Sequence, residues 1–128
     1  MHHVVWDAKL TEKARAHLSA LGYGSIVQYH TAEAVQTLRA TAGPFDLIFN
    51  DIDKEGYPDS LPIIKEKLKR KGVLIVDNLL WHGQILDPKD REQTTQAIRK
   101  FTKAITRDPD WIVTLLPIRD GMIVAYKK

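Results

Sequence analysis

The chain has 128 residues, a formal net charge of +3 and no cysteine. This length suits one domain with a substantial core, and the lack of cysteine excludes disulfides and thiolate metal sites. No apolar run reaches the roughly 20 residues of a membrane span, and the charge excess is too small to indicate nucleic-acid binding. We therefore expect a protein that can fold in a reducing cytoplasm, with no membrane partner.

The first part of the chain alternates short apolar runs with amphipathic stretches. Residues 3–6 predict a strand, residues 9–21 a helix that ends at two glycines, and residues 25–29 a second strand. Thr31 is expected to cap a helix that runs to about Thr41.

After a Gly-Pro break, residues 45–50 predict a third strand, apolar enough to be buried on both faces. A helix from Pro58 to Leu68 and a fourth strand at residues 73–76 follow. A long loop then leads to a helix expected to begin at Pro88, whose apolar stripe consists of Ala97, Ile98, Phe101 and Ile105.

Two last strands, residues 111–116 and 122–126, are joined by a short turn and predict an antiparallel hairpin. Strands that alternate with helices predict an α/β sandwich with a mostly parallel sheet. With no repeat and no linker, residues 1–128 are expected to form a single domain.

Polar residues follow the third and fourth predicted strands: Asp51, Asp53 and Lys54 after one, and Asp77 and Asn78 after the other. Open α/β sheets bind ligands at the carboxyl ends of their strands. Carboxylate and amide oxygens suit Mg, Ca or Mn rather than zinc. Carboxylates so close together would repel one another unless a cation or Lys54 lay among them. The alternative is that these residues only cap helices and solvate loops.

Lys54 has two open interpretations: a general base, or an ion-pair partner of Asp51 or Asp53. Trp81 and Tyr57 lie just downstream of the acidic residues. Each could form a wall for a flat substrate or for adenine, or could cover the sheet edge as part of the core. The basic run at residues 65–71 is typical of a solvated helix end, with an anion- or RNA-facing patch as the alternative.

Residues 45–57 resemble the strand-and-loop signature of the caffeoyl-CoA and catechol O-methyltransferase family. So do residues 71–83, with their Asp-Asn-x-x-Trp core, and residues 86–88 and 115–122. The resemblance covers nearly the whole chain, and the two acidic motifs are its most specific part. It implies a three-layer Rossmann-like methyltransferase sandwich that ends in an antiparallel hairpin.

The family transfers a methyl group from S-adenosylmethionine to a hydroxyl, often of a catechol-like aromatic acceptor, with a divalent cation. The resemblance implies that Asp51, Asp77 and Asn78 hold the metal. It also implies that Lys54 takes the proton from the acceptor hydroxyl, so that Lys54 and Asp51 form the catalytic pair. A bound cation would lower the pKa of that hydroxyl and fix its direction.

The resemblance places Asp53 close to cofactor and substrate, and Glu33 near the adenine-binding segment. Trp81 and Tyr57 are the candidate substrate contacts. The acidic residue that binds ribose hydroxyls should end the second strand of the family's sheet. Asp7 is the only candidate for it here, although an ungapped alignment puts Val5 at that place.

The chain begins at what resembles the family's second strand, so a first strand and a glycine-rich loop are missing from it. That strand lies in the middle of the family's sheet. We therefore expect either a homodimer in which two chains complete each other or a repaired sheet into which the first strand slides. A truncated reading frame is the third explanation.

Two other functions compete with the small-molecule methyltransferase. The missing glycine loop favours a catalytically dead metal- or ligand-binding remnant, or a partner subunit, and the intact acidic residues with Lys54 argue against it. Methylation of a tRNA hydroxyl is supported only by the basic run at residues 65–71.

Overall fold

The computed structural model describes every residue from Met1 to Lys128. The chain divides into two compact units, residues 1–41 and residues 42–128. None of its helices has both the length and the apolar character needed to cross a bilayer.

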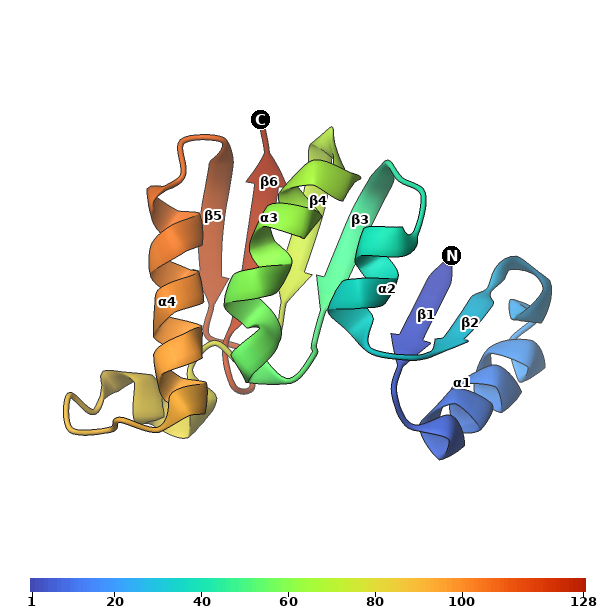
Figure 1. The fold of residues 1–128 in the computed structure, drawn as a ribbon, viewed down its shortest axis with the longest axis horizontal. Coiled ribbons are helices and arrows are strands. Elements are labelled where there is room, and N and C mark those ends of the chain that lie inside the picture. The colour runs from blue at the N-terminus through green and yellow to red at the C-terminus, as the bar shows by residue number, and fades with distance from the viewer. The chain divides into compact units, whose positions relative to one another are not determined.

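Residues 1–41 form a parallel two-stranded sheet with two helices (Figure 1). The elements are β1 (His2–Val5), α1 (Ala8–Ala20), β2 (Gln28–Thr31) and α2 (Ala34–Ala40). Helix α1 contacts the second strand: the Thr11 hydroxyl lies 2.9 Å from that of Thr31, and the Arg15 guanidinium lies 4.4 Å from the Tyr29 ring centroid.

The second strand and second helix of this unit begin later than expected. Residues 24–26 form a 3-10 turn, so β2 starts at Gln28 rather than at residue 25. Thr31 belongs to β2, where it pairs with Val5. The cap of α2 is therefore Glu33, whose carboxylate accepts two backbone N–H groups of the first turn.

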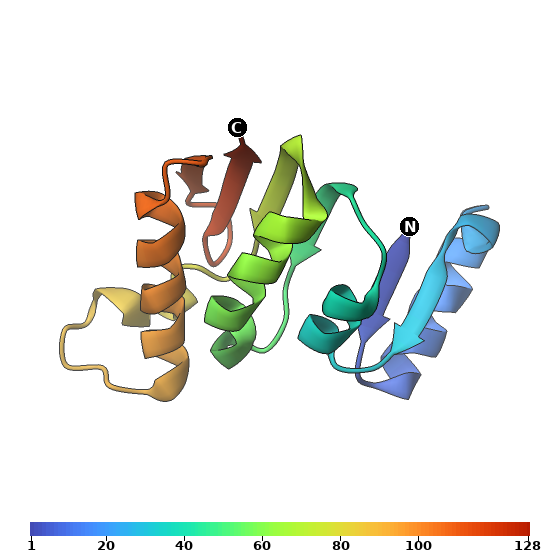
Figure 2. The same ribbon diagram turned by 45° about the horizontal axis from the view of Figure 1, so that its top comes forward.

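Residues 42–128 form a mixed four-stranded sheet with two long helices on one face (Figures 1 and 2). The elements are β3 (Phe45–Asn50), α3 (Tyr57–Lys67), β4 (Leu68–Val76), α4 (Gln93–Arg107), β5 (Trp111–Leu116) and β6 (Met122–Lys127), with 3-10 turns at Lys54–Gly56 and Trp81–Leu86. The strand order is β3-β4-β6-β5. β3 and β4 run parallel, and β6 is antiparallel to both of its neighbours, which confirms the predicted hairpin.

The core of this unit lies between the sheet and helices α3 and α4. Ile98, Phe101 and Ile105 recur at helical spacing on α4 and are fully buried, as are Leu74 and Val76 of β4. An apolar stripe of this period is what lets a helix cover one face of a sheet.

Helix α4 begins at Gln93, so the prediction of a helix from Pro88 was wrong. The side chains of Asp87 and Asp90 accept backbone N–H groups two residues ahead of them. Such local hydrogen bonds favour turns over helix. The helix therefore begins only after the turn at Asp90.

The opposite face of the four-stranded sheet is uncovered, because α3 and α4 lie on the same side. Leu47 and Phe49 on this face are 55% and 54% exposed, so the prediction that β3 is buried on both faces was wrong. The pairing register continues the face across the sheet, from Leu47 to Val73, Tyr126 and Ile112.

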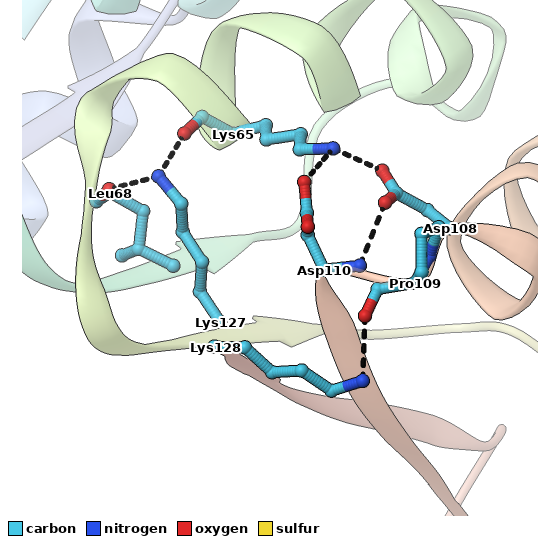
Figure 3. Close-up of polar contacts among 7 residues, drawn as sticks. All are labelled: Lys65, Leu68, Asp108, Pro109, Asp110, Lys127 and Lys128. Carbon is cyan, nitrogen blue, oxygen red and sulfur yellow. Dashed lines mark hydrogen bonds and ion pairs between the residues drawn. The ribbon is translucent and has the colours of Figure 1, made fainter.

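Lysines join the end of α3 to the ends of β5 and β6 (Figure 3). The Lys65 ammonium lies 2.6 Å from Asp108 Oδ2 and 2.7 Å from Asp110 Oδ2. Lys127 donates to the backbone carbonyls of Lys65 and Leu68, at the negatively polarised end of the helix. Lys65, the first residue of the basic run, is therefore part of an ion-pair network.

This network predicts a dependence of stability on pH. The hydrogen bond from Lys65 lowers the pKa of Asp108 below its ordinary 3.8 and raises the pKa of Lys65 above 10.5. Because the pKa of Asp108 is lowered on folding, the ionised carboxylate stabilises the fold above about pH 3.8, and this stabilisation is lost as the pH falls through the folded-state pKa. Because the pKa of Lys65 is raised on folding, its ammonium stabilises the fold below about pH 10.5, and this stabilisation is lost as the pH rises through the folded-state pKa.

We expect Lys65→Met to lower the urea midpoint relative to wild type at about pH 6, and this deficit to shrink towards about pH 3. Urea titrations of both proteins at the two pH values measure it. A deficit that stays constant between them would show that the network's charge does not matter.

Candidate functional site

The carboxyl ends of β3 and β4 bring two predicted acidic residues to one edge of the sheet. The two strands pair in parallel up to Asn50 and Val76, and the Asp77 N–H donates to the Asn50 carbonyl at 3.2 Å. Asp51 and Asp77 therefore leave neighbouring strands side by side. This is the edge at which open α/β sheets bind ligands.

Lys54 lies at this edge as the ion-pair partner of Asp51. Its Nζ is 2.8 Å from Asp51 Oδ1 and 3.2 Å from the Ile52 carbonyl oxygen. The Lys54 side chain is 10% exposed and that of Asp51 47% exposed, so the ammonium is held inside while the carboxylate faces outward. The structure thus contains the ion pair, and the general-base role of Lys54 stays a prediction.

Tyr57 lies beneath the edge, in the core. It is 0% exposed, its ring centroid is 5.4 Å from that of Phe101, and its hydroxyl donates to the Asp77 carbonyl at 2.7 Å. Burial, with the nearby charges of Asp51 and Asp77, raises the pKa of the Tyr57 hydroxyl and keeps it a donor. Tyr57 therefore has the core role that the sequence left open: a ring so buried anchors the end of β4 and does not line a substrate surface.

Asp77 and Asn78 form the second half of the edge. Asp77 is buried, and its Oδ1 accepts the Asn78 backbone N–H at 2.8 Å. Asn78 adopts a left-handed φ of 60°, and its Nδ2 lies 3.5 Å from Asp120 Oδ2. With the amide nitrogen directed to a carboxylate, the amide oxygen is the end of this side chain that can serve a cation.

The chemistry of these donors fits a hard divalent cation. Asp51, Asp77 and Asn78 offer only oxygen ligands, the type that Mg, Ca and Mn take. No group of three or more histidine, cysteine or carboxylate side chains converges to hold a metal. A cation here would therefore be held by two carboxylates and one amide, with water completing its shell, as is usual for Mg.

The loop that follows Asn78 is fastened from two sides. On one side, Asp120 accepts the His82 N–H through Oδ1 at 2.6 Å. On the other side, the Arg99 guanidinium of α4 donates to four backbone carbonyls, those of Gln84, Ile85, Asp87 and Asp90. Trp81, the predicted substrate contact, lies half-buried in this loop. His82 beside it is exposed.

Sequence reasoning did not single out Asp120 or Arg99. The signal for Asp120 was the match of residues 115–122 to the family signature, which named no role for the residue. Arg99 sits on a helix whose stripe was interpreted only for its apolar members, so nothing local indicated that its side chain reaches back to the loop.

The predicted cofactor residues lie in different places. Asp7 and Glu33 belong to residues 1–41 and cap helices there: Asp7 Oδ1 accepts the Leu10 N–H at 2.9 Å, and Glu33 caps α2. Asp53 is exposed at the start of the 3-10 turn that follows β3. A capping carboxylate retains lone pairs for a ligand, and the cofactor contacts of all three residues stay predictions.

Comparison with known proteins identifies the family. A family model described as O-methyltransferase matches residues 4–128, and so spans both compact units. Catechol O-methyltransferase of Niastella koreensis is 32% identical over 133 residues, which cover 96% of this chain and 60% of that protein. Catechol O-methyltransferase domain-containing protein 1 of Mus musculus is 35% identical over 99 residues, which cover 73% of this chain and 38% of that protein.

The fold agrees with this match. The O-methyltransferase of Bacillus cereus in complex with SAH aligns with a TM-score of 0.90 at 25% identity, over 99% of this chain and 62% of that one. The chain thus spans less than two thirds of the length of each of these three relatives. Since the family model covers almost every residue, the chain belongs to the O-methyltransferase family.

Proposed function

We propose that this chain carries the metal and acceptor sites, together with contacts for the cofactor, of an S-adenosylmethionine-dependent O-methyltransferase that acts on a hydroxyl of a small, catechol-like aromatic acceptor. The observation that carries the proposal is the edge formed by Asp51, Lys54, Asp77 and Asn78 at the ends of adjacent strands. The name of the Niastella koreensis relative supports the acceptor class. The SAH bound to the Bacillus cereus relative supports the cofactor, because SAH is what S-adenosylmethionine becomes once its methyl group has left.

The chemistry divides between the methyl donor, the cation and the protein. A divalent cation at Asp51, Asp77 and Asn78 would lower the pKa of a bound acceptor hydroxyl and fix its direction. Holding that oxygen against the methyl carbon supplies proximity. Lys54 must first give the proton of its ammonium to water. As the carbon–oxygen bond forms, the carbon–sulfur bond breaks, and the hydroxyl proton passes to the neutral Lys54 amine, which acts as general base.

Other residues position these groups. Tyr57 fixes the end of β4 through the Asp77 carbonyl, and Trp81 offers an aromatic face next to which a flat acceptor can lie. Asp7, Glu33 and Asp53 complete the proposal as cofactor contacts. The proposed architecture is a three-layer Rossmann-like sandwich, in which a further layer covers the open sheet face.

A transfer assay with methyl-labelled S-adenosylmethionine and catechol tests this function. We expect labelled methoxyphenol in the presence of Mg²⁺ and its loss when EDTA removes the cation. Equal transfer with EDTA would contradict the metal role. A chain that binds cation and cofactor but transfers no methyl group to any catechol would contradict the enzyme.

A second function, that of a subunit completed by a partner, is favoured by the open sheet face. Its rows, Leu47–Val73–Tyr126–Ile112 and Phe49–Ile75–Val124–Thr114, contain no charged side chain. A second copy of this chain could therefore pack there without burying an unpaired charge, and we propose a homodimer through this face.

We expect light scattering to give the mass of a dimer, and Phe49→Lys to give that of a monomer, because an ammonium would be buried in the apolar interface. The matched control is Leu86→Lys, which places the same charge at an exposed apolar position of the loop after β4. A monomeric wild type, or a Phe49→Lys variant that stays dimeric, would contradict this interface.

A further inference from the structure

We propose that Asp120 is a positioning residue of the cation site: it aims the Asn78 amide so that its oxygen faces the cation, and it holds the loop that carries Asn78. The inference rests on the proposed role of Asn78 as a metal ligand. It assigns a task to a residue of the β5–β6 turn, far from the acidic motifs in sequence.

The contacts of Asp120 are divided between the side chain of Asn78 and the backbone of the loop. Its Oδ2 lies 3.5 Å from Asn78 Nδ2, and its Oδ1 lies 2.6 Å from the backbone nitrogen of His82. The Asp120 side chain is only 14% exposed. Because water competes little for these oxygens, hydrogen bonds to them are strengthened.

The loop needs such support, because its backbone is strained. Asn78, Trp81 and His82 have φ values of 60°, 47° and 53°, in the left-handed region that non-glycine residues rarely adopt. Conformations of this kind persist only where surrounding contacts impose them. Here the β5–β6 turn does so: its carbonyls at Asp120 and Gly121 accept N–H groups from Leu80 and Leu79 at 2.8 and 2.9 Å.

Gly121 allows the turn to approach this closely. Its φ is 79°, and a Cβ at this position would lie 2.4 Å from Leu80 Cγ. The turn and the loop after β4 are thus fitted to each other, with Asp120 as the side chain that reaches Asn78.

The choice of a carboxylate at position 120 decides which end of the Asn78 amide is free. An ionised carboxylate only accepts hydrogen bonds, so Asp120 can bind the Asn78 side chain only at the NH₂ group of Asn78. An asparagine in the same place has an NH₂ group of its own. It could donate to Asn78 Oδ1 and occupy the atom that the cation requires.

The test is therefore the isosteric variant Asp120→Asn, measured by calorimetric titration with Mn²⁺ and with Ca²⁺. We expect a loss of cation affinity of about 10- to 100-fold, the usual effect of removing a residue that orients a metal ligand, with an unchanged circular dichroism spectrum. Asp46→Asn is the control, because it removes the same charge from an exposed residue of β3, near the strand's opposite end. It should leave the affinity unchanged.

The double variant Asn78→Ala/Asp120→Asn separates orientation from charge. If Asp120 acts through Asn78, its replacement should have no further effect once the amide is gone. A loss of the same size in the Asn78→Ala background would overturn the inference in favour of a charge effect. Equal cation binding by wild type and Asp120→Asn would overturn it alone, whereas a wild type that binds neither ion would overturn the proposed metal site and the inference together.

Discussion

Replacing Lys54 with methionine is expected to lower the rate of methyl transfer by about 10²- to 10⁴-fold, the usual contribution of a positioned general base. Cation affinity should stay the same or rise, because the variant frees the Asp51 carboxylate from the ammonium 2.8 Å away. A fall in the rate of methyl transfer without a fall in cation affinity is what the loss of a general base predicts.

Lys54→Arg is the matched variant, because it keeps the positive charge beside Asp51 but cannot be deprotonated in a protein. If Lys54 is the base, both variants lose turnover in the labelled-methyl assay. A Lys54→Arg variant with full turnover would show that the lysine serves only as an ion-pair partner. A joint fall of turnover and cation affinity in Lys54→Met would show a structural role.

Phe101→Ala is expected to destabilise residues 42–128 by about 3–5 kcal/mol. Phe101 is fully buried on α4, and its ring packs on Tyr57, whose hydroxyl holds the Asp77 carbonyl. Removing the ring leaves a cavity beneath the end of β4, so the sheet edge at Asp51 and Asp77 should loosen together with the core.

Urea unfolding measures this effect, with Leu86→Ala in the loop after β4 as the control. Leu86 is 75% exposed and lies outside the sheet face proposed as the dimer interface, so its truncation should change the free energy of unfolding by about 0.5 kcal/mol or less. A loss as large in Leu86→Ala as in Phe101→Ala would show that the effect is not specific to the buried ring. An unchanged stability in Phe101→Ala would contradict the described core.

The sequence predicted the elements whose signals are local. Strand β3 was predicted with its observed bounds, and the stripe of Ile98, Phe101 and Ile105 fell on one buried helix face. The start of β2 was missed because its register is set by pairing with β1, from His2 opposite Gln28 onwards. Periodicity within one segment contains no information about that partner.

Burial on the two sheet faces could not be predicted in the same way. Leu47 and Phe49 are as apolar as the side chains of a buried strand, but hydrophobicity does not indicate whether a covering layer is present. Both helices of residues 42–128 lie on one side, so these two side chains remain exposed. The apolar pattern of β3 therefore indicates a face that a further layer or a partner can cover.

The candidate site was predictable where its residues follow strands and not where they arrive from a distance. Asp51 and Asp77 are adjacent because parallel strands end together, which the sequence implied. The Tyr57 hydroxyl finds a carbonyl 20 residues away, and Asp120 meets Asn78 across 42 residues. Contacts of this separation depend on the topology of the sheet and have no local signature.

Calorimetric titration of S-adenosylmethionine into the purified chain, with and without Mg²⁺ or Ca²⁺, tests the proposed site most directly. Binding of the cation, together with cofactor binding of micromolar order, is the expected result and would make a screen of acceptors worthwhile. Cation binding without cofactor binding would confine the chain to the metal and acceptor side of a site that a partner completes. Absence of cation binding would contradict the proposed metal site at Asp51, Asp77 and Asn78.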